Sequence, residues 1–485
     1  MLRKLFIPLV LVLFAIAALL YFLFGTRHTV RDVRDAVRVE QFQLRNGLTV
    51  VVMPNDRLPA VTHLLIIKAG GADDPYGNTG VAHYIEHLMF AGTKDNPAGT
   101  YERAVARQGG EQNAFTGYDY TGYYATVPRD RLEEIMQLEL DRLQNLAFTP
   151  EQAARELKVI TEERHMRVEN NPGALFDEQL DAITFLNHPY GRPLIGWAED
   201  MAQLRAADAQ RFFNRYYKPD NMVLVVAGDV DVRQVRKLAQ RYYGQLPAGK
   251  TAPRAWPAEP PLRLERHATM RDATVQTPRL VRQYIAPSLK EGASEHALPL
   301  AVLAEYLGGG VTSRLYQALV REQQLAVNVS AGYDQFRLGP SLLVISATPR
   351  DGVSLEALEA ALDRELQQIL QATPDAAAVT RAKTQMKAAA IFAQDGLQPL
   401  AMLMGSLYAI GLNEQYFYDW VEAVEGVSGP EMLAAAQHVL QSRRQVTGYL
   451  LPEKDAAAPM ENTRPASPVP SDEPPAMEAE DDDAA

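Results

Sequence analysis

Two histidines and a glutamate are spaced so that they could hold and use a metal ion. His83, Glu86 and His87 lie in the segment Gly80-Val-Ala-His-Tyr-Ile-Glu-His-Leu-Met-Phe90. On a helix the two histidines project from one face, one turn apart, so both imidazoles can bind one Zn²⁺ at about 2.0–2.1 Å. Glu86 lies on the same side and can take a proton from a metal-bound water. A pair of structural histidines at a helix end is the alternative.

A catalytic zinc site also needs a third protein ligand and an open position. A helix is predicted from 151 to about 168, with Thr149 as its N-terminal cap. Glu156 and Glu163 are seven residues apart and therefore lie on one face of this helix, whereas Glu162 points elsewhere. By themselves these carboxylates would also fit an ordinary solvated helix face, so spacing alone leaves both interpretations open.

The composition limits what else could bind a metal or a partner. The 485 residues include no cysteine, which excludes disulfides and thiolate metal sites and leaves histidine and carboxylates as ligands. The chain has 48 Lys+Arg and 60 Asp+Glu, a formal net charge of −12. An acidic chain of this kind is not expected to bind nucleic acid, because phosphate contacts need a basic surface.

The ligand residues fall in a predicted first domain, residues 37–246. Its predicted elements are a hairpin over 42–53, a strand over 61–69, a helix over 206–217 and a strand over 221–228. Asn46-Gly47 is a typical turn for the hairpin. Residues 247–270 follow as a predicted linker, since their first part is rich in proline and has no periodicity.

A second predicted domain, residues 271–452, repeats this plan. Its predicted elements are a strand over 280–285, helices over 298–307 and 430–440, and a strand over 445–451. When the apolar helices of the two parts are aligned, Glu305 falls on Glu86. Val302 and Tyr306 then take the places of the two histidines. The sequence therefore predicts two similar α+β units, of which only the first has a metal-ligand pair.

The two ends of the chain differ from the rest. Residues 5–24 form an uninterrupted apolar run of twenty residues, long enough as a helix to span about 30 Å of hydrocarbon. We expect residues 1–27 to be an uncleaved anchor in the inner (cell) membrane, with a cleaved signal and a soluble periplasmic form as the alternative. Residues 453–485 hold ten acidic and two basic residues, so we expect a disordered acidic tail.

The side of the membrane is less clearly indicated. Four arginines follow the apolar run, which by the positive-inside rule would keep the body in the cytoplasm. A chain without thiols tolerates an oxidising compartment. We therefore expect the catalytic body to face the periplasm or the exterior.

Longer motifs resemble the insulinase/pitrilysin family of zinc peptidases, specifically its short two-domain branch, which includes bacterial processing proteases and the mitochondrial processing peptidase. The similarity extends over about residues 37–452. The matching segments are 80–93, 109–123, 156–163, 188–191, 217–229 and 308–315. The resemblance implies two α+β domains, each a mainly antiparallel sheet packed with helices, that close like a clam shell around a peptide or an unfolded protein segment.

The resemblance also implies roles for individual residues. Glu163 matches the third ligand of one Zn²⁺ per chain, beside His83 and His87, and Glu156 matches a carboxylate that orients the site. Glu86 would activate the zinc-bound water. Asn113 and Ala114 match the strand edge that holds an extended substrate by its backbone; in isolation, Asn113 would fit an ordinary turn residue.

One departure from the family pattern concerns the second domain. Arg321 matches an arginine that binds substrate near the zinc, but the tyrosine expected six or seven residues later is replaced by Val327 or Asn328. A metal-free homologous subunit in a heterodimer could supply the missing group, and a homodimer is the other expectation. A further alternative is that Tyr333, or nothing, takes the place of that tyrosine.

Two other functions remain open from the sequence. The same fold could serve as a non-catalytic assembly or chaperone-like subunit. The complete set of His83, Glu86, His87 and Glu163 argues against this alternative. A zinc-dependent hydrolase of non-peptide substrates is a weaker alternative.

Overall fold

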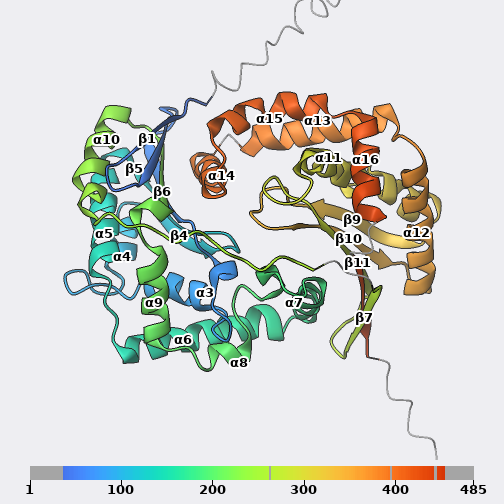
Figure 1. Cartoon of the computed structure of the whole chain (residues 1–485), viewed down its shortest axis with the longest axis horizontal. Helices are drawn as coiled ribbons and strands as arrows, with labels where there is room; N and C mark the ends of the chain where they lie inside the picture. The colour runs from blue at the N-terminus through green and yellow to red at the C-terminus, as the bar shows by residue number, and fades with distance from the viewer. Residues whose placement is uncertain (1–36, 261–263, 394–395, 442–444, 454–485) are drawn as a thin grey trace, which may run out of the picture.

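The computed structural model describes residues 37–260, 264–393, 396–441 and 445–453, which form two halves (Figure 1). The predicted anchor (1–27) and almost all of the predicted acidic tail (453–485) lie outside these residues. Within the described part of the chain, no helix is both long enough and apolar enough to cross a membrane.

The first half is built on a six-stranded sheet with the order β1-β2-β6-β3-β5-β4. Its strands are β1 (Glu40–Gln43), β2 (Thr49–Pro54), β3 (Ala60–Ile67), β4 (Glu111–Thr116), β5 (Thr121–Pro128) and β6 (Met222–Gly228). Only β2 and β6 run parallel, and all other neighbours are antiparallel. The predicted hairpin is confirmed, because β1 and β2 pair across a turn at Gly47, whose φ is +98°.

The second half contains a five-stranded sheet with the order β7-β11-β8-β10-β9. Its strands are β7 (Arg266–Asp272), β8 (Arg279–Ala286), β9 (Ala326–Tyr333), β10 (Ser341–Pro349) and β11 (Gln445–Pro452). Of its neighbouring strands, again a single pair, β7 with β11, runs parallel, and three antiparallel strands follow β11 just as three follow β6 in the first sheet. The two sheets therefore correspond strand for strand from β2 and β7 onward, and the predicted pair of similar α+β units is confirmed.

Helices cover one face of each sheet. Those of the first half are α3 (Val81–Leu88), α4 (Thr100–Arg107), α5 (Leu132–Asn145), α6 (Pro150–Arg164), α7 (Pro172–Thr184), α8 (Ala198–Met201), α9 (Ala206–Tyr216) and α10 (Val232–Arg241). Those of the second half are α11 (Ala297–Gly308), α12 (Leu355–Gln371), α13 (Ala376–Ala393), α14 (Leu397–Ala409), α15 (Glu414–Gly426) and α16 (Gly429–Leu440). Short π-helical segments follow α6 (His165–Glu169) and precede β9 (Tyr316–Glu322).

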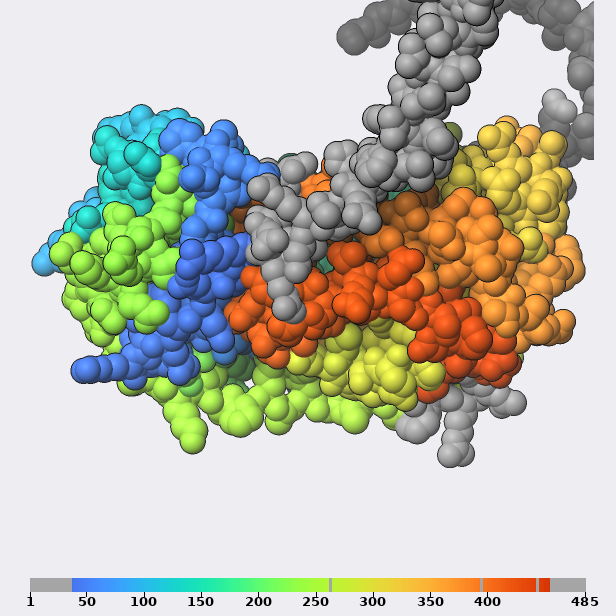
Figure 2. Space-filling model, turned by 90° about the horizontal axis from the view of Figure 1, so that it is seen from above, coloured from blue at the N-terminus to red at the C-terminus, as the bar shows by residue number. Residues whose placement is uncertain are grey.

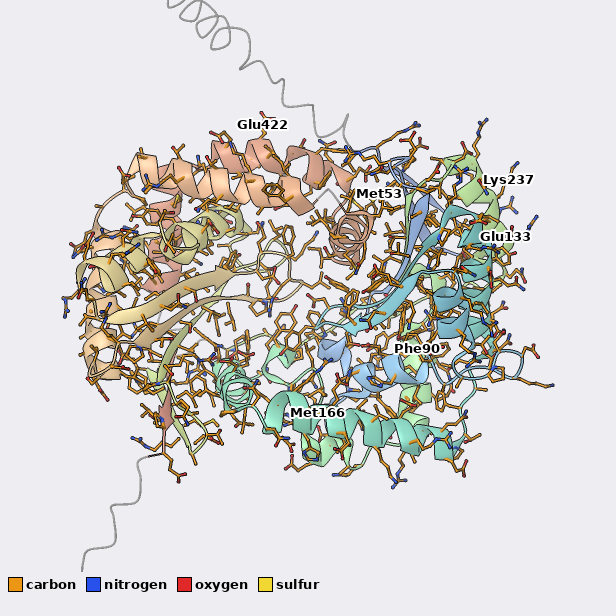
Figure 3. The ribbon with its side chains drawn as sticks, turned by 180° about the vertical axis from the view of Figure 1, so that it is seen from behind. Met53, Phe90, Glu133, Met166, Lys237 and Glu422 are labelled. Carbon is orange, nitrogen blue, oxygen red and sulfur yellow. The ribbon has the colours of Figure 1, made fainter. Side chains whose placement is uncertain are left out.

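One helix of each half packs against the sheet of the other half, and we call these two helices, α7 and α14, the exchanged helices. Helix α14 packs on the open face of the first sheet, where Leu400 and Met404 join a buried cluster with Met53 and Leu64. Figure 3 shows Met53 on the side of the first sheet that faces α14, and in Figure 2 the orange-red residues near position 400 lie against blue residues of the first half. A Cβ at Gly405 would come within 2.9 Å of Leu64, so a small residue is needed at this crossing.

Helix α7 makes the reciprocal contact with the second sheet. Phe176 and Leu180 are buried against Val281 and Val446. A Cβ at Gly448 would lie 2.6 Å from the Phe176 ring, which therefore uses the space that this glycine leaves. Burial of apolar surface stabilises by about 25 cal/mol per Å². These two exchanged helices therefore hold the halves in a defined arrangement.

Residues 247–260, most of the predicted linker, form no helix or strand but are attached to the first half. Arg254 forms an ion pair with Asp73 at 2.9 Å, and Trp256 contacts the rings of His188 and Tyr190. Strand β7 begins at Arg266, so the last residues of the range predicted as linker belong to the second sheet, where β11 supplies their hydrogen-bond partners.

Candidate metal centre

Helix α3 begins in a conformation that its sequence makes possible. Gly80 precedes it with φ of +87°, and a Cβ there would lie 2.5 Å from the carbonyl oxygen of Ile195. The buried carboxylate of Asp74 accepts hydrogen bonds from the backbone N–H of Gly80 at 2.7 Å and of Ala82 at 2.9 Å. Burial nevertheless raises the pKa of Asp74 to about 8. These contacts fix the start of the helix that carries both histidines.

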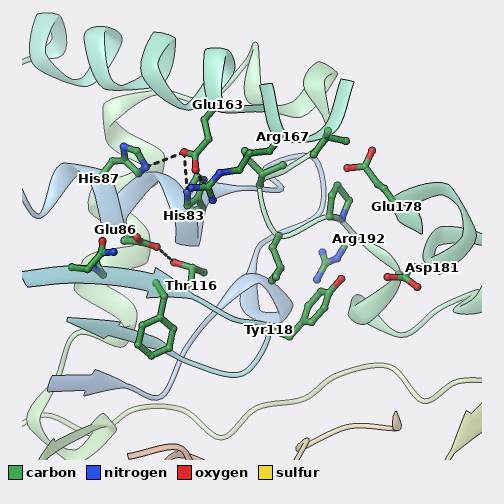
Figure 4. Close-up of a pocket in the computed structure, with 18 residues that line it drawn as sticks. His83, Glu86, His87, Thr116, Tyr118, Glu163, Arg167, Glu178, Asp181 and Arg192 are labelled. Atoms are coloured by element: carbon green, nitrogen blue, oxygen red, sulfur yellow. Dashed lines mark hydrogen bonds and ion pairs between the residues drawn. The ribbon is translucent and has the colours of Figure 1, made fainter. Parts of the chain in front are cut away.

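The two histidines of α3 converge on a carboxylate from α6. Oε2 of Glu163 lies 3.6 Å from Nε2 of His83 and 3.4 Å from Nε2 of His87 (Figure 4). The imidazole rings are 4.8 Å apart and nearly perpendicular. One potential ligand atom from each of the three residues lies within 4.8 Å of the others, the only such group among the described residues.

This donor set fits Zn²⁺. Burial, reinforced by the charges of His87 and Arg167, lowers the pKa of His83 to about 3, so its imidazole is neutral and has a lone pair to offer. Burial also opposes protonation of His87, but the hydrogen bond with Glu156 and the nearby carboxylates outweigh it and raise the pKa. Two imidazole nitrogens and one carboxylate oxygen are the ligand set of a catalytic zinc with an open position.

Glu86 lies beside this group without belonging to it. Its side chain is 9% exposed, and Oε2 accepts a hydrogen bond of 2.5 Å from Oγ1 of Thr116 at the end of β4. Burial raises the pKa of Glu86, while the hydrogen bond from Thr116 and the charge of His87 lower it in part. The carboxylate is therefore oriented toward the cavity from the side opposite α6, as Figure 4 shows.

Two further charged side chains contact the candidate ligands. Oε2 of Glu156 lies 3.6 Å from Nδ1 of His87, and Nη1 of Arg167 lies 2.8 Å from Oε1 of Glu163. Arg167 was not among the predicted site residues, although its spacing of four from Glu163 on a continuing helix could have indicated it. Such contacts orient metal ligands and tune their basicity.

The metal-ligand group forms one wall of a cavity of about 600 Å³. Asn113, Ala114 and Thr116 of β4 line it, together with residues of α7 and of the segment 191–195. Strand β4 is the last strand of the first sheet and pairs with β5, and no other described strand pairs with its outer edge. The cavity therefore places a free strand edge beside the ligand group.

Comparison with known families assigns this chain. The model described as Insulinase (Peptidase family M16) matches residues 50–197, and the one described as Peptidase M16 inactive domain matches residues 203–386. A zinc protease of Mycobacterium bovis, otherwise uncharacterized, is 32% identical over 333 residues, which cover 66% of this chain and 73% of that protein. The chain belongs to the M16 peptidase family.

Other proteins are similar over most of the chain. Zinc protease PqqE of Helicobacter pylori is 26% identical over 418 residues, 85% of this chain and 93% of that one. The crystal structure of a Helicobacter pylori protease has a TM-score of 0.80, with 24% identity, and covers 86% of this chain and 100% of that one. The periplasmic protease PqqL of Escherichia coli has a TM-score of 0.72, with 21% identity over 85% of this chain and 47% of its own length. The two structures support the fold.

The residues expected from the second M16 domain are not at the metal centre. Arg321 is exposed and does not line the cavity. Val327, at one of the expected tyrosine positions, is 51% exposed. The hydroxyl of Tyr333 donates a hydrogen bond of 2.5 Å to the carbonyl of Pro287, within the second half. Every described residue around this cavity comes from the first half.

Proposed function

We propose that this protein is a zinc endopeptidase that hydrolyses extended peptides or unfolded protein segments. The observation that carries the proposal is the convergence of His83, His87 and Glu163 next to Glu86 and a free strand edge. The names of its M16 relatives, which include zinc proteases, support the same chemistry.

His83, His87 and Glu163 would hold one Zn²⁺, which when bound polarises a scissile carbonyl and lowers the pKa of a water. Glu86 acts as general base by taking a proton from that water at its carboxylate and then passing it to the departing amine. Thr116 holds this carboxylate in place through its hydroxyl. Burial raises the pKa of Glu86, which brings the carboxylate closer to the range in which it can both accept and return a proton.

The peptide is bound by its backbone at the β4 edge. Asn113 and Ala114 lie on this edge and line the cavity. A substrate strand added there would continue the first sheet, and its alternate side chains would point into the cavity. This mode selects extended chains more than particular sequences.

We also propose a location and an assembly. The apolar run 5–24 would anchor the protein in the cell membrane, with the peptidase body on the periplasmic or outer side. The periplasmic location of the related PqqL supports this side. A metal-free homologous subunit in a heterodimer would supply the tyrosine that this chain lacks at Val327 or Asn328, and a homodimer is the other assembly. Cell fractionation and protease accessibility of intact cells and spheroplasts test the location.

The decisive experiment compares the purified protein with its Glu86→Gln variant. We expect the variant to retain one zinc per chain, measured by mass spectrometry of metals, and to lose about 10²–10⁴-fold in peptide hydrolysis. Glu356→Gln, an exposed carboxylate on α12, is the matched control and should leave both values unchanged. Full activity of Glu86→Gln with zinc bound would exclude Glu86 as the base, and wild-type protein that binds zinc but hydrolyses no peptide would favour a non-catalytic subunit.

A further inference from the structure

A second cavity of about 370 Å³ lies in the second half, between α11, α13, α14 and α15. Phe336, from the loop between β9 and β10, closes one side of it. The metal cavity lies among α3, β4, α6 and α7. In each half the cavity is therefore lined by the helix that packs on the last strand of the sheet, α3 or α11. It is also lined by the exchanged helix, α7 or α14.

The correspondence of these elements follows from their contacts. Helix α3 packs against β4, α6 and α9, and α11 packs against β9, α13 and α16. Strands β4 and β9 are the last strands of their sheets. The exchanged helices α7 and α14 complete the set. The second cavity is thus the equivalent of the metal cavity in a half that has no group of three metal ligands among its described residues.

The walls of the second cavity are mainly apolar. Met386, Leu403, Leu407, Phe417 and Trp420 supply aliphatic and aromatic surface. The hydroxyl of Tyr416 is directed to the side chain of Gln335, at 3.3 Å. Trp420 is half-buried, and its indole ring can contact a ligand bound in the cavity.

One carboxylate interrupts this apolar lining. Glu305 on α11 is half-buried, and its side chain makes no hydrogen bond or ion pair with any residue in the described ranges. An anionic group at an apolar surface is costly unless a cation compensates it. Aromatic faces such as that of Trp420 also attract cations. A ligand that combines apolar surface with positive charge matches both features.

We propose that this cavity, the distal pocket, binds a basic and apolar segment of the same peptide that is cleaved at the metal centre. The cation of a lysine or arginine pairs with Glu305, and a neighbouring aromatic or aliphatic side chain enters the apolar part beside Trp420. The proposal rests on the proposed peptidase function and adds a substrate preference to it.

The two cavities are connected by one apolar cluster. Phe115 lines the metal cavity, and Phe336, Leu403 and Phe417 line the distal pocket. All four belong to the cluster between the first sheet and α14, together with Tyr120, whose ring packs on Phe115. The two cavities therefore border the same apolar contact between the first sheet and α14.

Binding is measured without turnover, on zinc-loaded full-length protein carrying Glu86→Gln. The probes are two fluorescein-labelled peptides with a Gly/Ser background, one containing a single Phe-Lys pair and the other Phe-norleucine. We expect the lysine peptide to bind about tenfold more tightly, because a hydrogen-bonded charge contributes about that much. Adding Glu305→Gln should abolish this difference. Adding Glu356→Gln, the matched charge control, should preserve it.

The apolar part is tested separately on the same background. Trp420→Ala should weaken both peptides by about tenfold, and Ala390→Trp, which fills the pocket, should weaken both as well. Folding of each variant is checked by its thermal unfolding.

The proposal is overturned if Glu305→Gln leaves the preference for the lysine peptide intact, or if neither pocket variant changes the affinities. Absence of peptide hydrolysis by the wild-type protein would instead overturn the proposed peptidase function. The binding comparison decides the distal pocket in either case.

Discussion

Helices α3 and α11 hold equivalent places in the two halves, but the side chains at their corresponding positions face different surroundings. In α3, His83, Glu86 and His87 look into a cavity that also receives Glu163 from α6. In α11, aligned as predicted from the sequence, Val302 is fully buried and Tyr306 nearly so. Of these three α11 residues, only Glu305, which aligns with Glu86, lines the second cavity.

The difference shows what each half needs in order to keep its fold. Both halves have a helix packed against the last strand of the sheet, and both have an exchanged helix. These shared features are therefore part of what maintains the fold. Among the described residues, a group of three potential metal ligands occurs in the first half alone, although apolar side chains can fill the equivalent helix positions, as Val302 and Tyr306 of α11 show. A buried pair of histidines and a carboxylate is costly without a function, which supports the first cavity as the site of the proposed hydrolysis.

The largest effect is expected from replacing Glu163, the proposed third zinc ligand of the first half. Glu163→Gln exchanges a charged ligand for a neutral amide, so we expect zinc to be lost on dialysis and peptide hydrolysis to fall by about 10³-fold or more. Metal content and initial rates measure both. Glu162→Gln, the exposed neighbour on the same helix, should have no effect. A zinc-loaded, active Glu163→Gln protein would place the third ligand elsewhere.

The exchanged helices should matter about equally for the two halves. Phe176→Ala on α7 and Met404→Ala on α14 each empty a buried site and should lower the free energy of unfolding by about 3–5 and 2–5 kcal/mol, respectively. Urea denaturation measures both. Met166→Ala, whose side chain is 68% exposed and points away from the body in Figure 3, is the control.

If only one of these variants is destabilised, the reciprocal packing is not symmetrical in energy. Should an alanine variant not fold, Phe176→Leu and Met404→Leu give the smaller loss expected of a near volume-conserving change.

A smaller effect on zinc binding is expected from changing Glu156, which contacts the ligand residue His87. Glu156→Gln retains the shape of the side chain that contacts Nδ1 of His87 but removes its charge. We expect the Kd for zinc to rise by about 10–100-fold, as measured by competition with a chromophoric chelator. Activity at saturating zinc should recover most of its wild-type value, and a variant that loses activity even there would give Glu156 a role beyond orienting His87.

The smallest effect concerns pH and the contact between the halves. His188 is 4% exposed and lies so close to Gly339 of the second half that a Cβ there would be 2.6 Å from its ring. Burial, then the charges of Arg192 and Arg337, lowers its pKa to about 4. An unfolded chain takes up this proton near pH 6.5, so the free energy of unfolding should fall as pH drops from about 6.5 to 4.

His188→Asn retains an acceptor for the N–H of Tyr190 and removes the titrating group. Its urea midpoint should change less between pH 7 and 4.5 than that of the wild type. His63, also buried with its pKa lowered to about 4, accounts for part of the remaining slope. Identical pH profiles for wild type and His188→Asn would show that His188 does not contribute.

Local patterns predicted much of the fold. Helix α6 begins at the predicted Thr149 cap, and the hairpin turn falls at Asn46-Gly47, because caps and turns depend on a few adjacent residues. The attached linker was not foreseen. Arg254 and Trp256 find partners far away in the sequence, and composition carries no information about such contacts.

The sequence alone determined which half could bind a metal, because helical periodicity puts His83 and His87 on one face whatever surrounds them. Tertiary structure decided the rest of the site. The approach of Glu163 and Thr116 depends on how α6 and β4 pack against α3, and the exchange of α7 and α14 shapes both cavities. Packing between distant segments results from the joint fit of many side chains, which no local spacing encodes.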